Sequence, residues 1–174
     1  MNEYVKLAKT SIENYIKTGK IIQIPKNLPE NFYNEKRGIF VTIYKTNPEK
    51  KLRGCIGTIS STKENIAKEI IDNAISAATC DYRFDCIQEN ELKNLQYEVS
   101  ILNTPEQIYS SHDLDPKKYG VIVKSKDEKS GILLPDIEGI ETPEQQISIA
   151  CQKAGIDVEK EEFELYRFTV SKHK

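Results

Sequence analysis

The feature that most constrains the fold is an order of hydrophobic patterns that occurs twice along the chain: strand, strand, helix, strand. In the first occurrence, β-branched and aromatic residues predict strands at 37–44 and 52–59. Apolar residues at three- and four-residue steps predict a helix at 62–79, and another strand follows at 96–102. An Asn-Pro turn separates the first two strands, which indicates a hairpin. This half of the chain therefore predicts a ββαβ unit.

The second occurrence has the same order with different residues. Strands are predicted at 119–123 and 132–135, and the last strand at 163–170. A helix is predicted between the second and third of these strands. Thr142 is followed directly by Pro143, and Gln145 lies three residues after Thr142, which is typical of a capped helix start. Gly155 is placed to end that helix.

These patterns predict an α+β protein made of duplicated ββαβ units around largely antiparallel sheet. The two similar halves run over about 20–103 and 104–170, and an amphipathic helix at 3–17 precedes them. We expect one domain over 1–174, because this length is enough to bury a core. The repeat rests on the order of elements and not on matching residues.

Charge and hydropathy exclude several classes of protein. The chain has 25 basic and 27 acidic residues, without the basic excess of a protein that neutralises many phosphates, so nucleic-acid binding is disfavoured. No apolar run approaches the roughly 18 residues of a membrane span, and the first residues lack a signal-peptide pattern. We expect a cytoplasmic protein that does not associate with membranes.

Cysteine and histidine content predicts neither a metal site nor a bound cofactor. The cysteines are widely spread and match no CxxC spacing, so we interpret them as free thiols. Cys80 and Cys86 are interpreted as ordinary core or loop thiols, and Cys151 lies on an apolar helix face. His112 is the only histidine placed to act as a base, because His173 falls in a tail that we expect to fray.

The stretch KLRGCIGTI, residues 51–59, contains the strongest candidate for chemistry. Strand alternation puts Arg53 and Cys55 on one face, where a guanidinium could lower the thiol pKa. Gly54 and Gly57 leave bare backbone that a ligand could approach. Alternatively, Cys55 is a small buried residue and the glycines admit a crowded helix.

Two further places could complete such a site. Asp81 and Arg83 lie in DYRF, directly after the predicted helix, and loops on rigid scaffolds often carry function. The alternative is a helix-exit turn in which they pair and cap backbone groups while Phe84 fills the core. Glu98 could be a base or an arginine partner if its strand face is that of Cys55, and otherwise it is a solvated residue.

Several of these motifs resemble one family, the AMMECR-type proteins, known in bacteria and archaea as protein A of the AmmeMemoRadiSam system. The matching stretches span about 38–168 and include GIFVTIYK, LRGCIGTI, DYRF, YEVSIL, LLP and CQKAGI. The resemblance implies a duplicated α+β fold with a larger and a smaller lobe. It also implies two partners, a Memo-like protein and a radical S-adenosylmethionine enzyme, but it does not specify a reaction.

The resemblance also assigns candidate residues. The carried-over positions are residues 52–57, Asp81, Arg83, Phe84 and residues 98–100. Among them, the residue chemistry argued above makes Cys55 and Glu98 catalytic candidates, and it makes Arg53, Gly54, Gly57, Asp81 and Arg83 ligand-binding candidates. Three positions depart from the family pattern: Tyr119 replaces a common histidine, Asp136 a usual glutamine, and Ile140 a usual tryptophan. Tyr119 therefore argues against a cysteine–histidine mechanism.

Two functional hypotheses remain. In the first, the groove around RGCIG binds a small anionic substrate with Cys55 as the nucleophile or the nearest thiol. In the second, the protein is a non-catalytic binding module that presents a substrate to the Memo-like and radical S-adenosylmethionine partners. Whether the protein is an enzyme is left open at this point.

Overall fold

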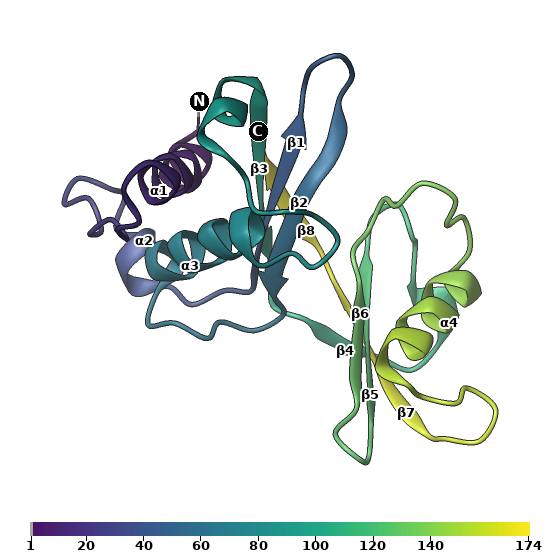
Figure 1. Cartoon of the computed structure of the whole chain (residues 1–174). Coiled ribbons are helices and arrows are strands. Elements are labelled where there is room, and N and C mark those ends of the chain that lie inside the picture. Colours follow the sequence, from purple (N-terminus) through teal and green to yellow (C-terminus); the bar gives the residue numbers. More distant parts are fainter. Residues whose placement is uncertain (1) are drawn as a thin grey trace. The chain divides into compact units, whose positions relative to one another are not determined.

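The chain divides into two compact units in a computed structural model that describes residues 2–174 (Figure 1). Unit 1 extends to Ile101 and includes Ser171–Lys174, and unit 2 comprises Leu102–Val170. Each unit holds one four-stranded sheet. Within the described residues, no helix is long and apolar enough to cross a membrane.

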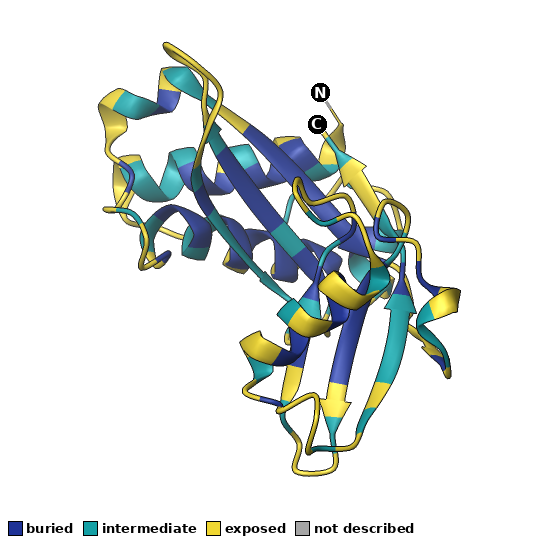
Figure 2. Cartoon of the chain, turned by 90° about the vertical axis from the view of Figure 1, so that its right-hand side faces the viewer, coloured by how far each residue is buried: buried dark blue, intermediate teal, exposed yellow. Residues whose placement is uncertain are grey.

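Unit 1 has its helices packed on one sheet. Its strand order is β2-β1-β3-β8. Helix α3 packs against β1 and β2, and α1 packs against α3 (Figure 1). Figure 2 shows the buried positions that run along these strands and helices. The elements are α1 (Glu3–Thr18), α2 (Asn31–Asn34), β1 (Ile39–Lys45), β2 (Lys51–Thr58), α3 (Ile66–Thr79), a 3₁₀ helix (Glu89–Asn94), β3 (Leu95–Leu102) and β8 (Val170–His173).

Helix α3 begins later than the sequence predicts. Its N-cap is Asn65, whose side chain accepts from Lys68 N–H, whereas the sequence predicts a helix from residue 62. Ser61 Oγ instead donates to the buried carboxylate of Glu69 at 2.9 Å. Residues 61–63 therefore bond to the Glu69 side chain and do not form the first turn of the helix.

Unit 2 repeats the arrangement on a smaller scale. Its strand order is β4-β7-β5-β6, and α4 packs against β5 and β6. The N-cap at Thr142, its capping box and the left-handed C-cap at Gly155 are all confirmed. The elements are β4 (Glu106–Ile108), a 3₁₀ helix (Ser111–Asp113), β5 (Gly120–Ser125), β6 (Ser130–Leu133), α4 (Pro143–Ala154) and β7 (Phe163–Phe168).

The structure confirms the predicted fold class of duplicated ββαβ units with antiparallel pairing, a larger and a smaller one. In both units the first strand lies between the second and the third. One prediction is wrong in detail: the single strand at 163–170 is two strands, β7 in one sheet and β8 in the other. The short strand β4 was not predicted.

Candidate functional site

Three polar side chains form a row across the sheet of unit 1, on the face opposite α3. Thr42 on β1 is paired with Cys55 on β2 and with Glu98 on β3. Thr42 Oγ1 lies 3.4 Å from Cys55 Sγ. The register therefore places Cys55 and Glu98 on one face, as the sequence hypothesis required, with Thr42 between them.

The Cys55 thiol is held in its protonated form. Burial raises its pKa, and the charges of Asp81 and Glu98 act in the same direction. The hydrogen bond with Thr42 and the charge of Arg83 oppose this shift without reversing it. The raised pKa favours the alternative in which Cys55 is a small, largely buried thiol, because burial outweighs the nearby cation.

Arg53 does not polarise the thiol, because its guanidinium binds elsewhere. The pairing of Ile43 with Gly54 and of Tyr44 with Leu52 leaves Arg53 as the extra residue of a β-bulge, which breaks the expected alternation. Its Nε and Nη2 donate to the two Glu91 oxygens, each at 2.9 Å. Its Nη1 donates to the carbonyl oxygen of Asp85 at 2.8 Å.

Asp81 connects the cysteine strand to the DYRF loop. Its buried carboxylate accepts from Cys55 N–H at 2.8 Å and from Arg83 Nε and Nη2 at 2.9 and 2.8 Å. The hydrogen bonds from Arg83 hold the Asp81 pKa well below its usual range although burial opposes this. The pairing of Asp81 with Arg83 agrees with the helix-exit alternative, but Phe84 is only half-buried.

A pocket of about 420 Å³ lies beside this loop, and Arg53 and Arg83 are both among its lining residues. Among the described residues, no acceptor is bonded to Arg83 Nη1, and 44% of the Arg83 side chain is exposed. Tyr82 is 95% exposed at the same place. The lining residues are Arg53, Tyr82, Arg83, Phe84 and Asp85.

Glu98 is buried and lies too far along the row to act directly on the thiol. Two strand spacings separate its Cα from that of Cys55 by about 10 Å. Its Oε2 lies 3.5 Å from Lys174 Nζ. The pKa of Tyr44 is raised, mainly by burial, and the charges of Glu98 and Cys55 add to this shift. Glu98 therefore contributes negative charge to the row, with Thr42 between it and the Cys55 thiol.

Protein atoms fill the space beside the two glycines of RGCIG. A Cβ on Gly54 would lie 2.2 Å from the carbonyl oxygen of Ala77 on α3. One on Gly57 would lie 2.3 Å from the Phe40 ring. These contacts favour the alternative in which the glycines admit close packing, since neither offers open backbone to a ligand.

The two histidines and Tyr119, one of the atypical family positions, have contacts of their own. His173 belongs to β8 and packs on Tyr4, with ring centroids 4.6 Å apart, so the tail is an ordered strand and the expectation that it frays is wrong. His112, in unit 2, bonds to Ser110 Oγ at 3.0 Å. Tyr119, also in unit 2, lies under Arg167 at 4.5 Å from its ring centroid.

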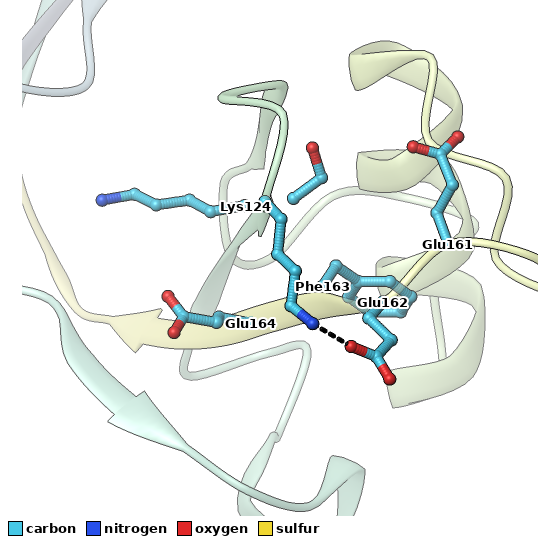
Figure 3. Close-up of a pocket in the computed structure, with 7 residues that line it drawn as sticks. Lys124, Glu161, Glu162, Phe163 and Glu164 are labelled. Atoms are coloured by element: carbon cyan, nitrogen blue, oxygen red, sulfur yellow. Dashed lines mark hydrogen bonds and ion pairs between the residues drawn. The ribbon is translucent and has the colours of Figure 1, made fainter.

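A second cavity, of about 610 Å³, lies in unit 2 and is lined by ion-pairing surface residues (Figure 3). The pair of Lys126 with Glu162 crosses it, and both side chains are more than 80% exposed. Exposed pairs of this kind contribute little free energy and do not fix a ligand in place. We therefore place the candidate site in unit 1.

The family model for AMMECR1 matches residues 5–173. The chain belongs to the AMMECR1 family. A protein of Thermotoga maritima is 49% identical over 171 residues, which are 98% of this chain and 97% of that protein. Protein CA_C1420 of Clostridium acetobutylicum is 45% identical over 98% of this chain, which spans only 36% of that longer protein.

A solved structure supports the AMMECR1 fold. The crystal structure of protein PH0010 from Pyrococcus horikoshii matches with a TM-score of 0.87 and 34% identity. The match covers 98% of this chain and 88% of that one. The family match accounts for the duplicated fold, while the chemistry must be argued from the residues of the site.

Sequence reasoning missed three residues of this AMMECR1 site. Thr42 could have been found, because pairing the two predicted hairpin strands places it opposite Cys55. Glu91 and Asp85 had no such signal, since they reach Arg53 from 38 and 32 residues away. Among residues 2–174, no cluster of three or more histidine, cysteine or acidic side chains is placed to hold a metal ion.

Proposed function

We propose that unit 1 binds a small anionic ligand, a carboxylate or phosphate, in the pocket between Arg53 and Arg83. The observation that carries this is the pair of arginines that line one pocket, with Nη1 of Arg83 bonded to no described residue. Arginine presents several donors in a plane that fits carboxylate and phosphate oxygens. The ligand would bind next to the Asp81 carboxylate that also holds the backbone of Cys55.

The carboxylates that pair with the two arginines set the character of the site. Glu91 and Asp81 hold the guanidinium groups in fixed orientations, so little side-chain freedom is lost when a ligand binds. They also neutralise most of the positive charge. A small ligand held by oriented hydrogen bonds fits such a pocket better than a polyanion held by net charge.

Binding is a better account of the site than nucleophilic catalysis by Cys55. A thiol whose pKa is raised carries little thiolate at neutral pH, and the thiolate is the nucleophilic form. Site-resolved iodoacetamide labelling against pH tests this. The labelling midpoint of Cys55 should lie above that of a free thiol, about 8.5. A midpoint below that value would restore the nucleophile hypothesis.

Titration with inorganic phosphate and with acetate, followed by NMR or calorimetry, tests the anion site. Arg83→Gln should weaken binding about ten-fold or more, since a hydrogen bond to a charged group contributes about 1.5–3 kcal/mol. Arg37→Gln is the matched control, because Arg37 also pairs with a carboxylate two residues earlier, on Glu35, and lies outside the pocket. Equal weakening in both variants would contradict the proposal.

The protein is also proposed to act with a Memo-like protein and a radical S-adenosylmethionine enzyme, and this part rests on the family resemblance. Exposed Tyr82 beside the pocket is a residue through which a partner could be recognised. In a mixture of the three proteins, Tyr82→Ala should reduce co-purification. Unchanged co-purification, or no complex with the unaltered protein, would contradict this role.

A further inference from the structure

Two exposed cysteines bracket the loop that lines the proposed anion pocket. Helix α3 ends at Thr79, and Cys80 is its C-cap. The chain returns to the same helix end at Ile87, whose N–H donates to the carbonyl oxygen of Ala78 at 2.9 Å. Cys86 precedes Ile87 and, like Cys80, is exposed and free. The loop between the two thiols is thus closed at its base.

Both sulfur atoms contact the same residue. Cys86 Sγ lies 3.2 Å from the carbonyl oxygen of Thr79. Cys80 Sγ lies 3.4 Å from Thr79 Oγ1. In a trans peptide, a carbonyl oxygen lies about 2.8 Å from the next Cα. Cys86 Sγ is therefore within about 6 Å of the Cys80 Cα, a separation that a rotation of the two side chains can bridge.

We propose that Cys80 and Cys86 form a reversible disulfide that closes the 81–85 loop. With a small-molecule disulfide as oxidant, the Cys80 thiolate attacks one of its sulfurs, forms a mixed disulfide and expels one thiolate. The Cys86 thiolate then attacks the Cys80 sulfur and expels the second. The two protons released by the cysteines go to the two expelled thiolates, so two protein thiols are oxidised and one external disulfide is reduced.

The disulfide would act on the pocket, and this consequence rests on the proposed function. The 81–85 loop supplies every lining residue except Arg53. It also carries Asp81, which bonds to Cys55 N–H. A cross-link at the base of the loop removes alternative conformations of these residues before a ligand arrives. Oxidation should therefore tighten phosphate binding several-fold by reducing the ordering cost.

Oxidation of the full-length protein with glutathione disulfide tests the cross-link without any ligand. After unreacted thiols are alkylated in denaturant, peptide mapping should find Cys80 joined to Cys86, with Cys55 and Cys151 alkylated. Cys86→Ser should stop at a glutathione adduct on Cys80, whereas Cys55→Ser should still form the internal disulfide. Recovery of Cys80 and Cys86 as alkylated residues or as separate glutathione adducts would overturn the proposal.

Phosphate titration of the reduced and oxidised forms separates the two proposals. A disulfide that forms but leaves the phosphate affinity unchanged overturns its regulatory role, while loss of binding in Arg83→Gln still supports the anion site. If neither form binds phosphate, the anion site fails and the peptide map still decides the disulfide. A several-fold gain on oxidation, reversed by a dithiol reductant, is the expected result.

Discussion

The two ββαβ units differ most where their scaffolds are most alike. In unit 1 the row Cys55–Thr42–Glu98 crosses three strands. The units can be matched by the glycine that lies against the helix, Gly54 in unit 1 and Gly131 in unit 2. Cys55 and Ile132 each follow that glycine, so the corresponding row in unit 2 is Ile132–Ile122–Tyr166. The same backbone positions therefore hold polar side chains in unit 1 and mainly large hydrophobic side chains in unit 2. The fold supplies a repeated frame, and only one copy carries the candidate chemistry.

A second matched position shows the same contrast. The fourth residue of each helix is polar and fully buried: Glu69 on α3 and Gln146 on α4. Glu69 accepts hydrogen bonds from Thr58, Ser61, Thr62 and Lys63. Gln146 donates one, to the carbonyl oxygen of Tyr119, and its Oε1 has no hydrogen-bond partner among residues 2–174. Through Glu69, unit 1 thus fixes the loop after β2, next to RGCIG, whereas the hydrogen bond of Gln146 goes to Tyr119, directly before β5.

The largest expected effect tests the shared frame. A Cβ on Gly54 or Gly131 would lie 2.2 or 2.0 Å from a helix carbonyl oxygen. Gly54→Ala and Gly131→Ala should each destabilise the protein by about 3 kcal/mol, measured by urea denaturation, with hydrogen exchange showing which unit opens.

Gly139→Ala is the control for that pair. Gly139 has φ +83° and open space around it, so alanine there should cost only about 1 kcal/mol. Sensitivity at Gly54 without sensitivity at Gly131 would break the equivalence of the two units.

The next effect tests the buried polar residues. Glu69→Gln should destabilise unit 1 by about 2 kcal/mol, because the NH₂ group of the glutamine would face hydroxyl and backbone N–H groups that now donate to the Glu69 carboxylate. Gln146→Met should cost only about 1 kcal/mol, since it removes one hydrogen bond. Urea denaturation of both variants measures the difference, and equal costs would contradict the contrast between the two loops.

The cost of Glu69→Gln should depend on pH in a defined direction. Burial alone would raise the Glu69 pKa, but its hydrogen bonds lower it below the ordinary value of 4.5. Stabilisation by the carboxylate is therefore present above that value and is lost as the pH falls through the lower folded-state pKa. The stability gap between Glu69→Gln and the unaltered protein should shrink on acidification, and a constant gap would argue against this assignment.

A smaller effect distinguishes the two arginines of unit 1. Arg83→Gln should raise the labelling midpoint of Cys55, because the charge of Arg83 opposes the upward shift of the thiol pKa. Arg53→Gln should leave it in place, since Arg53 pairs with Glu91. Peptide-resolved alkylation separates Cys55 from the exposed cysteines. A larger shift in Arg53→Gln than in Arg83→Gln would reverse the roles assigned to them.

The smallest effect comes from making the row of unit 1 resemble that of unit 2. Cys55→Val should change the free energy of unfolding by less than about 1 kcal/mol, because the site is half-buried and the volumes are similar. Phosphate binding should persist if Arg83 carries it. Loss of binding without loss of stability would show that the thiol contacts the ligand.

The predictability of each element followed the range of the interactions that form it. Helix α4 was predicted to the residue because its start and end depend on Thr142 and Gly155, which lie within it or beside it in the chain. The start of α3 was missed because Glu69 draws the preceding segment away. Likewise, strand alternation put Arg53 beside Cys55, but a bulge and a partner 38 residues away decide its position. Features set by neighbouring residues could be predicted from the sequence, and features set by distant partners could not.

Strand β8 has a consequence for how the molecule is made. It completes the sheet of unit 1, yet it follows all of unit 2 in the chain. During synthesis, the ribosome therefore releases every residue of unit 2 before the first unit can receive its edge strand and the Lys174–Glu98 contact. The smaller unit can fold from an uninterrupted segment while it emerges, whereas the unit that carries Cys55 keeps an open sheet edge until all of unit 2 has been synthesised.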